Sequence, residues 1–469
     1  MAWVTTFRPL VLALSSLLAV ALSAVLPCGP LDLRTALDLA GKRSDEVAIK
    51  QAEVATAEVD RSLARSLAIL PIGNATFVIG PDPAAHGTIN SIPGPGPSPQ
   101  YTGNTNRSLN DLGAFERVDV TAVQPLWTWG QLSGARDAAR AGLLARQHLL
   151  DDTLSQVQLR VIQLYWGDAL ARKFLAIAAD VEKAIADVEA RVQKSLKAED
   201  GTVSPSDKYQ LAVFKAELAG RKAEAIHGQE LARIGLAATL ALSRDELQIK
   251  EVDLSAAPVS QPTLAQALAR ADLYRPDLLA LSSAIDAKKG ELQAKEGALF
   301  PQLFIAGQFS YAYAYNRDIQ LNPWVSDPFN ELTAGVVLGV RQDLNLATLV
   351  AQKNKSRSEL LGIERQYDGL RRLIATQVET ALADLTSASA RFAAAQEGLA
   401  AGKSWFRAAG LDFEAGVGDT KSLLTAYRGY VESQLAGAQA AYDITVAKAR
   451  LDQATAQPLV QGEPTCVLQ

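Results

Sequence analysis

The chain has 469 residues, of which 48% are hydrophobic and only 6% aromatic, and its formal net charge is -5. Methionine occurs once, and alanine fills long stretches between regularly spaced leucine and valine, a composition typical of long helices packed closely together. Because the slight negative charge comes without a basic face, the composition argues against a nucleic-acid-binding protein.

The N-terminal segment has the pattern of a secretory signal peptide. One cation, Arg8, precedes an apolar run over residues 10–22, and Ala24 is a small residue suited to cleavage by signal peptidase. The run is shorter than the roughly 20 residues that a spanning helix needs, which disfavours the alternative of a membrane anchor. We therefore expect residues 1–24 to be removed on export.

The two cysteines, Cys28 and Cys466, are too few for a disulfide framework, although a bond between them would persist in an exported protein. Cys28 follows the predicted signal peptide and is a candidate for lipidation. However, Pro27 occupies the position where a lipidation signal has a small residue. An unmodified or disulfide-bonded thiol is therefore the preferred alternative.

The sequence is internally duplicated. Residues 33–37 (LRTAL) return as residues 264–268 (LAQAL), and residues 68–71 (AILP) return as residues 298–301 (ALFP). A period this long indicates a duplicated domain and not a solenoid. The predicted organisation is a first structural repeat over residues 31–250, a second over residues 262–458 and a C-terminal tail over residues 459–469.

Each repeat is predicted to contain a helix, a strand, a loop, a strand, a very long helix, a break and a further helix. In the first repeat the strands are predicted near residues 72–79 and 116–126. The loop over residues 81–110 is crowded with Pro, Gly, Asn and Ser, so it cannot pack a core and should be exposed. The long helix that follows carries an apolar seam through Leu150, Leu154, Val157, Val161 and Leu164.

In the second repeat the strand pattern is clearer. From residue 303 onward, one face carries Leu, Ile, Gly and Phe and ends in Tyr311, Tyr313 and Tyr315, while its partner over residues 332–340 alternates Leu, Ala and Val with Thr and Gly. An apolar face that ends in aromatics suits a membrane strand whose tyrosines lie at the membrane interface. The helix predicted over residues 346–413 would be on the order of 100 Å long.

Four strands cannot stand alone in a bilayer, because every backbone donor and acceptor must be paired there. Three copies would supply twelve strands, whereas two would give a narrow barrel that its own side chains fill. The predicted fold class is therefore α+β: long α-helical coiled coils with a four-stranded contribution to a trimeric, 12-stranded membrane barrel. Residues 72–126 and 302–344 would form the barrel strands and their external loops.

Two motifs resemble the TolC-type outer membrane efflux proteins. The segment FEAGVGD over residues 413–419 is similar to the helix-turn-helix at the periplasmic tip of that family, and QPLWTWG over residues 124–130 is similar to its strand-to-helix junction. The resemblance covers about residues 31–458. It implies a trimeric outer-membrane channel-tunnel whose tip docks on a periplasmic adaptor bound to an inner-membrane pump, without a cofactor.

The resemblance also assigns residues to the tip. The two turns that would contact the adaptor consist of Gly201, Thr202, Val203, Ser204 and Pro205, and of Gly416, Val417 and Gly418. Glycine there permits positive φ and close approach of a neighbouring helix. Some members of the family have an aspartate ring just beyond this turn, but the matching positions here are Ser422 and Thr425. Asp412, Glu414 and Asp419 are the substitute candidates for a pore gate.

An enzymatic role is disfavoured by the isolation of the three histidines, His86, His148 and His227, in different predicted elements. The sequence also lacks a phosphate-binding loop and a dinucleotide fingerprint. The main alternative function is a periplasmic coiled-coil adaptor or structural protein. A second alternative keeps the same duct but uses it for type I protein secretion, and the absence of Met-rich or His-rich tracts disfavours metal export.

Overall fold

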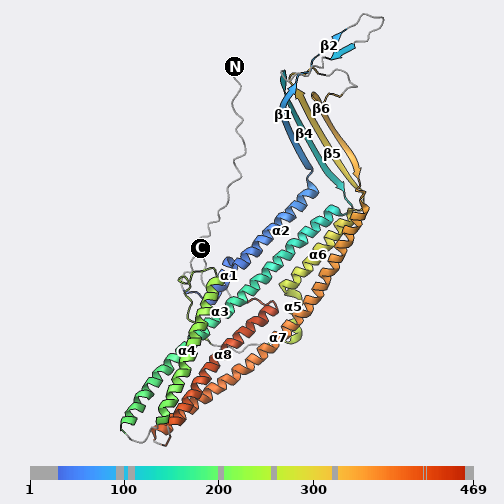
Figure 1. The fold of residues 1–469 in the computed structure, drawn as a ribbon. Helices are drawn as coiled ribbons and strands as arrows, with labels where there is room; N and C mark the ends of the chain where they lie inside the picture. Colours follow the sequence, from blue (N-terminus) through green and yellow to red (C-terminus); the bar gives the residue numbers. More distant parts are fainter. Residues whose placement is uncertain are drawn as a thin grey trace.

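The computed structural model describes residues 30–90, 100–103, 111–198, 205–254, 261–319, 326–415, 417, 418 and 420–459. Within them, a curved sheet stands at one end of a bundle of very long helices (Figure 1). Several predicted features lie outside these residues: the signal peptide, Cys28, Cys466, tip residues 201–204, Gly416 and Asp419.

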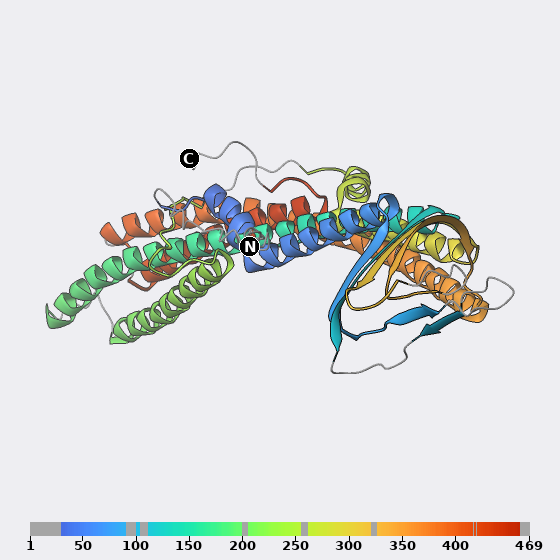
Figure 2. The same cartoon turned by 90° about the horizontal axis from the view of Figure 1, so that it is seen from above.

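The same order of elements occurs twice along the chain. The first half contains α1 (Leu33–Arg43), α2 (Asp45–Ile69), β1 (Ile72–Pro83), β4 (Leu112–Trp127), α3 (Gln131–Ala198) and α4 (Pro205–Thr239). The second half contains α5 (Leu264–Tyr274), α6 (Pro276–Gly297), β5 (Gln302–Ala314), β6 (Glu331–Arg341), α7 (Leu346–Glu414) and α8 (Thr420–Ala454). A small hairpin of β2 (Gly87–Asn90) and β3 (Gln100–Gly103) lies beyond the sheet (Figures 1 and 2).

The long elements confirm the prediction of an α+β chain with a four-stranded sheet. Helix α7 has 69 residues and ends one residue beyond the predicted helix. The sequence expected one helix before each strand pair, and this was wrong, since two helices are present. Ser44 separates α1 from α2, and Arg275 separates α5 from α6, because each of the two residues has an extended backbone. Arg275 precedes Pro276, whose ring excludes the helical conformation from the residue before it.

The predicted loop over residues 81–110 also contains structure that the sequence did not reveal. Strand β1 continues to Pro83, and β2 pairs with β3 in antiparallel register from Gly87↔Gly103 to Asn90↔Gln100. Proline is tolerated at a strand edge, where its missing N–H needs no partner. The expectation of a purely irregular loop is therefore corrected to a longer strand followed by a short hairpin.

The strand order within the sheet is β1-β4-β5-β6, and every neighbouring pair is antiparallel. The helices next to the sheet follow the same order, because α2 packs on α3, α3 on α6 and α6 on α7. Farther from the sheet, α4 and α8 each pack on α3, and α8 also packs on α7. The fold therefore has two open edges, with β1 and α2 on one and β6 and α7 on the other.

Helices α3 and α6 meet through glycine near the sheet. A Cβ added at Gly290 would lie 2.6 Å from the Ala138 nitrogen and 2.7 Å from the Gly134 oxygen. Both are backbone atoms, so no side chain can move aside to relieve the contact. This close crossing fixes the two central helices beneath the two central strands.

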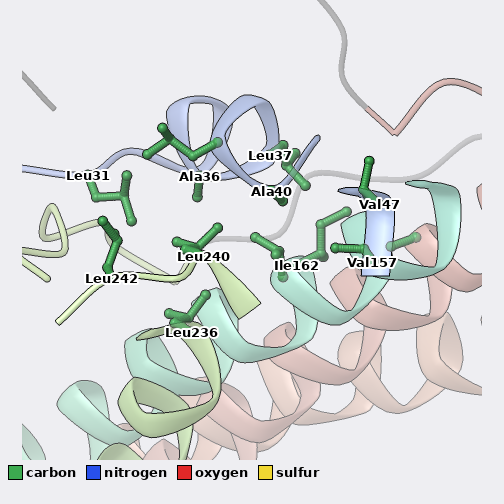
Figure 3. Packing of buried hydrophobic residues seen from close by; sticks show 13 residues of the cluster. Leu31, Ala36, Leu37, Ala40, Val47, Val157, Ile162, Leu236, Leu240 and Leu242 are labelled. Atoms are coloured by element: carbon green, nitrogen blue, oxygen red, sulfur yellow. The ribbon is translucent and has the colours of Figure 1, made fainter. Parts of the chain in front are cut away.

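The apolar core is divided along the bundle. One cluster joins the N-terminal segment and α1 to α3 and α4, with Leu31, Leu37, Val157 and Leu236 nearly inaccessible to solvent (Figure 3). A second joins α5, α6, α7 and α8, and a third joins α3, α4 and α8 toward the far end. Each cluster is thin, so the long helices remain exposed over much of their length.

Candidate functional site

One face of the sheet is apolar and exposed. The register places Phe77 of β1, Val120 of β4, Phe309 of β5 and Val336 of β6 on this face. Val336 and Phe77, on the two edge strands, are 73% and 64% exposed and extend an exposed apolar surface across the sheet. This face requires an apolar environment that the described residues do not themselves provide.

The opposite face carries a network of polar side chains. Arg117 Nε donates to Asp119 Oδ2 at 2.7 Å, and the Ser310 hydroxyl donates to Asp119 Oδ1 at 2.7 Å across the β4–β5 pair. On β6, the Thr333 hydroxyl donates to Glu331 Oε1 at 2.7 Å. The alternation of apolar and polar faces is that of a membrane barrel with lipid outside and water inside.

The predicted interface tyrosines gather at the end of the sheet away from the helices. Tyr311 and Tyr313 share the apolar face, and Tyr315 follows directly after β5. The rings of Tyr313 and Tyr315 lie 4.8 Å apart, edge to face. The Tyr315 hydroxyl donates to Glu116 Oε1 at 3.2 Å. The side chain of Tyr315 therefore has an apolar ring and a hydrogen-bonded polar end, as tyrosines at a membrane interface do.

A second aromatic group, which the sequence analysis missed, lies where the sheet joins the helices. The Trp127 and Trp129 rings are 5.9 Å apart, and Trp129 lies 5.4 Å from Phe300. Trp129 Nε1 donates to the Pro301 carbonyl oxygen at 2.7 Å. All three rings are at least half exposed. The available signal was the pair of tryptophans in WTWG at the end of a strand.

The two aromatic groups are separated by a membrane-sized band. Trp127 pairs with Leu303, which precedes Tyr313 by ten residues on β5. At about 3.3 Å per residue and a strand tilt of about 40°, this corresponds to a height of about 25 Å, the apolar thickness of membrane barrels.

The loops at the outer end of the sheet are tied together. Arg317, after β5, forms a 2.8 Å ion pair with Asp82 of β1 and lies 3.8 Å above the Phe329 ring before β6. Beside it, the hydrogen bond with the Asp318 carboxylate raises the pKa of His86. These contacts connect the loops of both repeats at the rim of the sheet.

At the far end of the bundle, α3 and α7 end and α4 and α8 begin (Figure 1). The Asp412 carbonyl oxygen accepts hydrogen bonds from Val417 N at 3.0 Å and Gly418 N at 2.9 Å, and Val417 is 85% exposed. Gly418 does not adopt a positive φ, which corrects one expected use of this glycine. A Cβ there would lie 3.0 Å from Phe413 N, so the space at Gly418 is limited by its own turn. The expected close approach of a neighbouring helix hairpin stays a prediction.

The candidate gate residues lie around this turn. Asp412 and Glu414 are exposed at the end of α7, while Ser422 and Thr425 are exposed on the first turns of α8. The Thr425 hydroxyl donates to the Lys421 carbonyl oxygen at 2.8 Å within its own helix. The described candidates are thus brought together at one tip.

Farther along α8, two contacts that the sequence did not predict couple the helical hairpins. Arg428 of α8 forms an ion pair with Glu217 of α4 at 3.0 Å. Tyr427 packs between Phe214 of α4 and Phe406 of α7, with ring centroids 6.4 and 5.0 Å away. Burial raises the pKa of Tyr427 to about 12. Any separation of α8 from α4 near the tip must break the Arg428–Glu217 ion pair and the Tyr427–Phe214 contact.

Among the residues that the structure describes, no cluster of three or more His, Cys, Asp or Glu side chains is suited to a metal ion. None of the described helices combines the length and apolarity needed to cross a membrane.

No protein-family model matches the chain, and no curated protein sequence matches it. Solved structures do match over almost its whole length. The Neisseria gonorrhoeae MtrE outer membrane channel, in its open state, has a TM-score of 0.71 and 17% identity, covering 91% of this chain and 89% of that chain.

Two further matches have the same character. The Campylobacter jejuni CmeC outer membrane channel has a TM-score of 0.70 and 13% identity, covering 90% of this chain and 85% of that chain. The Vibrio cholerae outer membrane protein VceC has a TM-score of 0.67 and 13% identity, covering 91% and 97%. This chain therefore has the fold of the outer-membrane channels, as its resemblance to the TolC type predicted.

Proposed function

We propose that the chain is one subunit of a homotrimeric outer-membrane channel that conducts substrates from a periplasmic adaptor and inner-membrane pump to the cell exterior. The observation that carries the proposal is the two-faced sheet, with exposed Val336 and Phe77 on one side and the Arg117–Asp119–Ser310 network on the other. The shared fold of the outer-membrane channels supports it.

The open edges support closure by identical copies. β1 and α2 lie on one edge, and β6 and α7 lie on the other, in the sheet and in the helical layer alike. One head-to-tail contact therefore extends both layers at once. Repeated around a ring, it removes every unpaired strand edge, as a bilayer requires. Three copies give twelve strands, which leave an aqueous lumen within the barrel.

The helical end supplies the docking and gating surface in this proposal. The exposed Val417 and the turns at residues 201–205 and 416–418 contact the adaptor, while Asp412, Glu414 and Asp419 form charged rings by threefold symmetry. Adaptor binding moves α8 away from α4, which breaks the Arg428–Glu217 ion pair and dilates the tip. The pump provides the energy, so the duct itself needs no catalytic residues.

A test begins with membrane fractionation and ends with conductance. We expect the protein in the outer-membrane fraction, released by detergent and not by a high-salt wash, and we expect stepwise conductance when it is reconstituted in planar bilayers. Release by salt alone would support the adaptor alternative and refute the membrane sheet. Quantitative recovery in the membrane without conductance would refute the duct.

Coupling to an adaptor is tested by a photo-crosslinking residue at Val417, with a control at Leu361, which is also exposed and lies on the shaft of α7. We expect an adaptor protein in the Val417 adduct only. Equal adducts from both positions, or none from Val417, would refute docking at the tip.

A further inference from the structure

A cavity of about 330 Å³ lies between α3, α4 and α8, beside the contacts that couple the two helical hairpins. Both α4 and α8 pack on α3 in this part of the bundle (Figure 1). All three helices supply apolar side chains to the cavity wall: Phe174 and Ile177, Phe214 and Leu218, and Val431 and Leu435. Protein interiors contain few voids larger than a water molecule, and pockets of roughly 300 Å³ and more are typical of ligand sites.

Small residues keep this space open. On α3 the cavity is lined by Gly167, Ala171 and Ala178, at positions where a packed helix pair would place larger apolar side chains. On α4 it is lined by Ala225 and Gly228. A Cβ added at Gly228 would meet no atom within 4 Å, so this glycine does not serve a close helix crossing as the glycines between α3 and α6 do. The helices therefore leave a gap in their own apolar contact.

The charged side chains around the cavity balance one another. They are three carboxylates and three cations: Glu217, Glu224, Glu432, Arg221, Lys222 and Arg428. Arg428 forms ion pairs with Glu217 at 3.0 Å and Glu432 at 3.2 Å, and Lys222 forms one with Glu182 of α3 at 2.7 Å. The remaining Arg221 and Glu224 have opposite charges. An ionic ligand would bring an unbalanced charge into an apolar space, so the charge pattern favours an uncharged occupant.

Two aromatic rings and one hydroxyl group define the ligand further. Phe174 and Phe214 line the cavity from two different helices, and their rings suit a flat aromatic molecule. Tyr442 of α8 also lines it, and its hydroxyl makes no hydrogen bond to another residue that the structure describes. Burial raises the pKa of Tyr442, so the hydroxyl stays neutral. It can therefore bond to a single polar group on the ligand.

We propose that this cavity binds a small, uncharged aromatic molecule, and that the bound molecule holds α8 against α4. The second part rests on the proposed function, in which α8 moves away from α4 when the tip dilates. That movement would take Val431 and Leu435 out of the cavity wall and expose the ligand to water. A ligand that binds one arrangement more tightly shifts the equilibrium toward it, so an occupied cavity opposes opening.

Binding is tested on the full-length protein in lipid nanodiscs, with the signal of empty nanodiscs subtracted. The probe is phenylnaphthylamine, an uncharged fluorophore whose emission rises in apolar surroundings. Anilinonaphthalene sulfonate carries the same rings with one negative charge. We expect saturable binding of phenylnaphthylamine, and binding of the sulfonate that is weaker by about tenfold or more, because its charge is not balanced in the cavity. Absence of saturable phenylnaphthylamine binding, or equally tight binding of the sulfonate, would overturn the proposal.

Two filling substitutions locate the site. Ala225→Leu on α4 and Ala171→Leu on α3 each enlarge a buried alanine that lines the cavity. The matched control is Ala223→Leu, at an exposed position of α4 outside the cavity. Each filling variant should bind phenylnaphthylamine about tenfold more weakly or worse, and the control should bind it as the wild type does. Circular dichroism identifies the folded variants, and unchanged binding in a folded filling variant would overturn the proposal.

Conductance separates this inference from the proposed function. In planar bilayers, phenylnaphthylamine should shorten the open time of the wild-type channel and leave that of Ala225→Leu unchanged. Equal inhibition of both, or inhibition of neither, would overturn the link between the cavity and opening. A conducting channel that does not bind the probe would refute the cavity site alone. Probe binding that Ala225→Leu abolishes, in a protein that never conducts, would refute the channel alone.

Discussion

Replacing Gly290 by alanine tests whether the α3–α6 crossing fixes the helices beneath the sheet. The new Cβ would lie 2.6 Å from Ala138 N and 2.7 Å from Gly134 O, well inside contact distance of atoms that belong to a backbone. Forcing a methyl group into such a packed contact costs about 1–3 kcal/mol. Helix propensity offsets this by roughly 0.5–1 kcal/mol, because alanine is the better helix former.

The matched control is Gly142→Ala on α3, where a Cβ meets no atom within 4 Å. It should stabilise the protein by roughly 0.5–1 kcal/mol through propensity alone. Urea unfolding of the detergent-solubilised protein, followed by circular dichroism at the helical minimum, should therefore separate the two variants by about 1–3 kcal/mol. Equal stability of the two variants would show that the crossing is not tightly packed.

Three further predictions concern the membrane face, the tip and its buried phenol. Val336→Lys should make the free energy of membrane insertion less favourable by about 2–4 kcal/mol, whereas Thr333→Lys on the opposite face should insert normally. Heat-modifiable electrophoretic mobility after refolding into vesicles measures the inserted fraction. Arg428→Ala should increase open-channel conductance in planar bilayers, because it removes the ion pair with Glu217. The pKa of Tyr427, raised to about 12 by burial, makes its contribution to stability complete below pH 10 and lost as the pH rises from 10 to 12, a loss that should be absent in Tyr427→Phe.

Each of these has a result that would refute it. Equal insertion of Val336→Lys and Thr333→Lys would show that neither face is in lipid. Unchanged conductance of Arg428→Ala would remove the ion pair from gating. An identical alkaline decline in Tyr427→Phe would assign the pH dependence to other groups.

The periodic parts of the fold were predictable from the sequence. The apolar seam of α7 predicted its limits to within one residue, because a long coiled helix repeats the same local requirement over many turns. The alternation from Leu303 predicted β5 and its two faces for the same reason. In both elements the local pattern and the tertiary environment agree.

What the sequence did not reveal depends on contacts between distant segments. The Trp127–Trp129–Phe300 group joins a strand end to a loop far along the chain, and only the register of β4 with β5 brings them together. The Arg428–Glu217 ion pair likewise depends on how two hairpins pack. Helix breaks were missed because an apolar pattern continues through Arg275 although Pro276 ends the helix locally.

The closure of four-stranded sheets into one barrel is tested most directly by native mass spectrometry of the protein extracted from outer membranes in mild detergent. We predict a complex of three identical chains that dissociates to single chains only on denaturation. A stable single chain, or a pair, under the same conditions would leave the edges of β1 and β6 unpaired in lipid and would contradict the account.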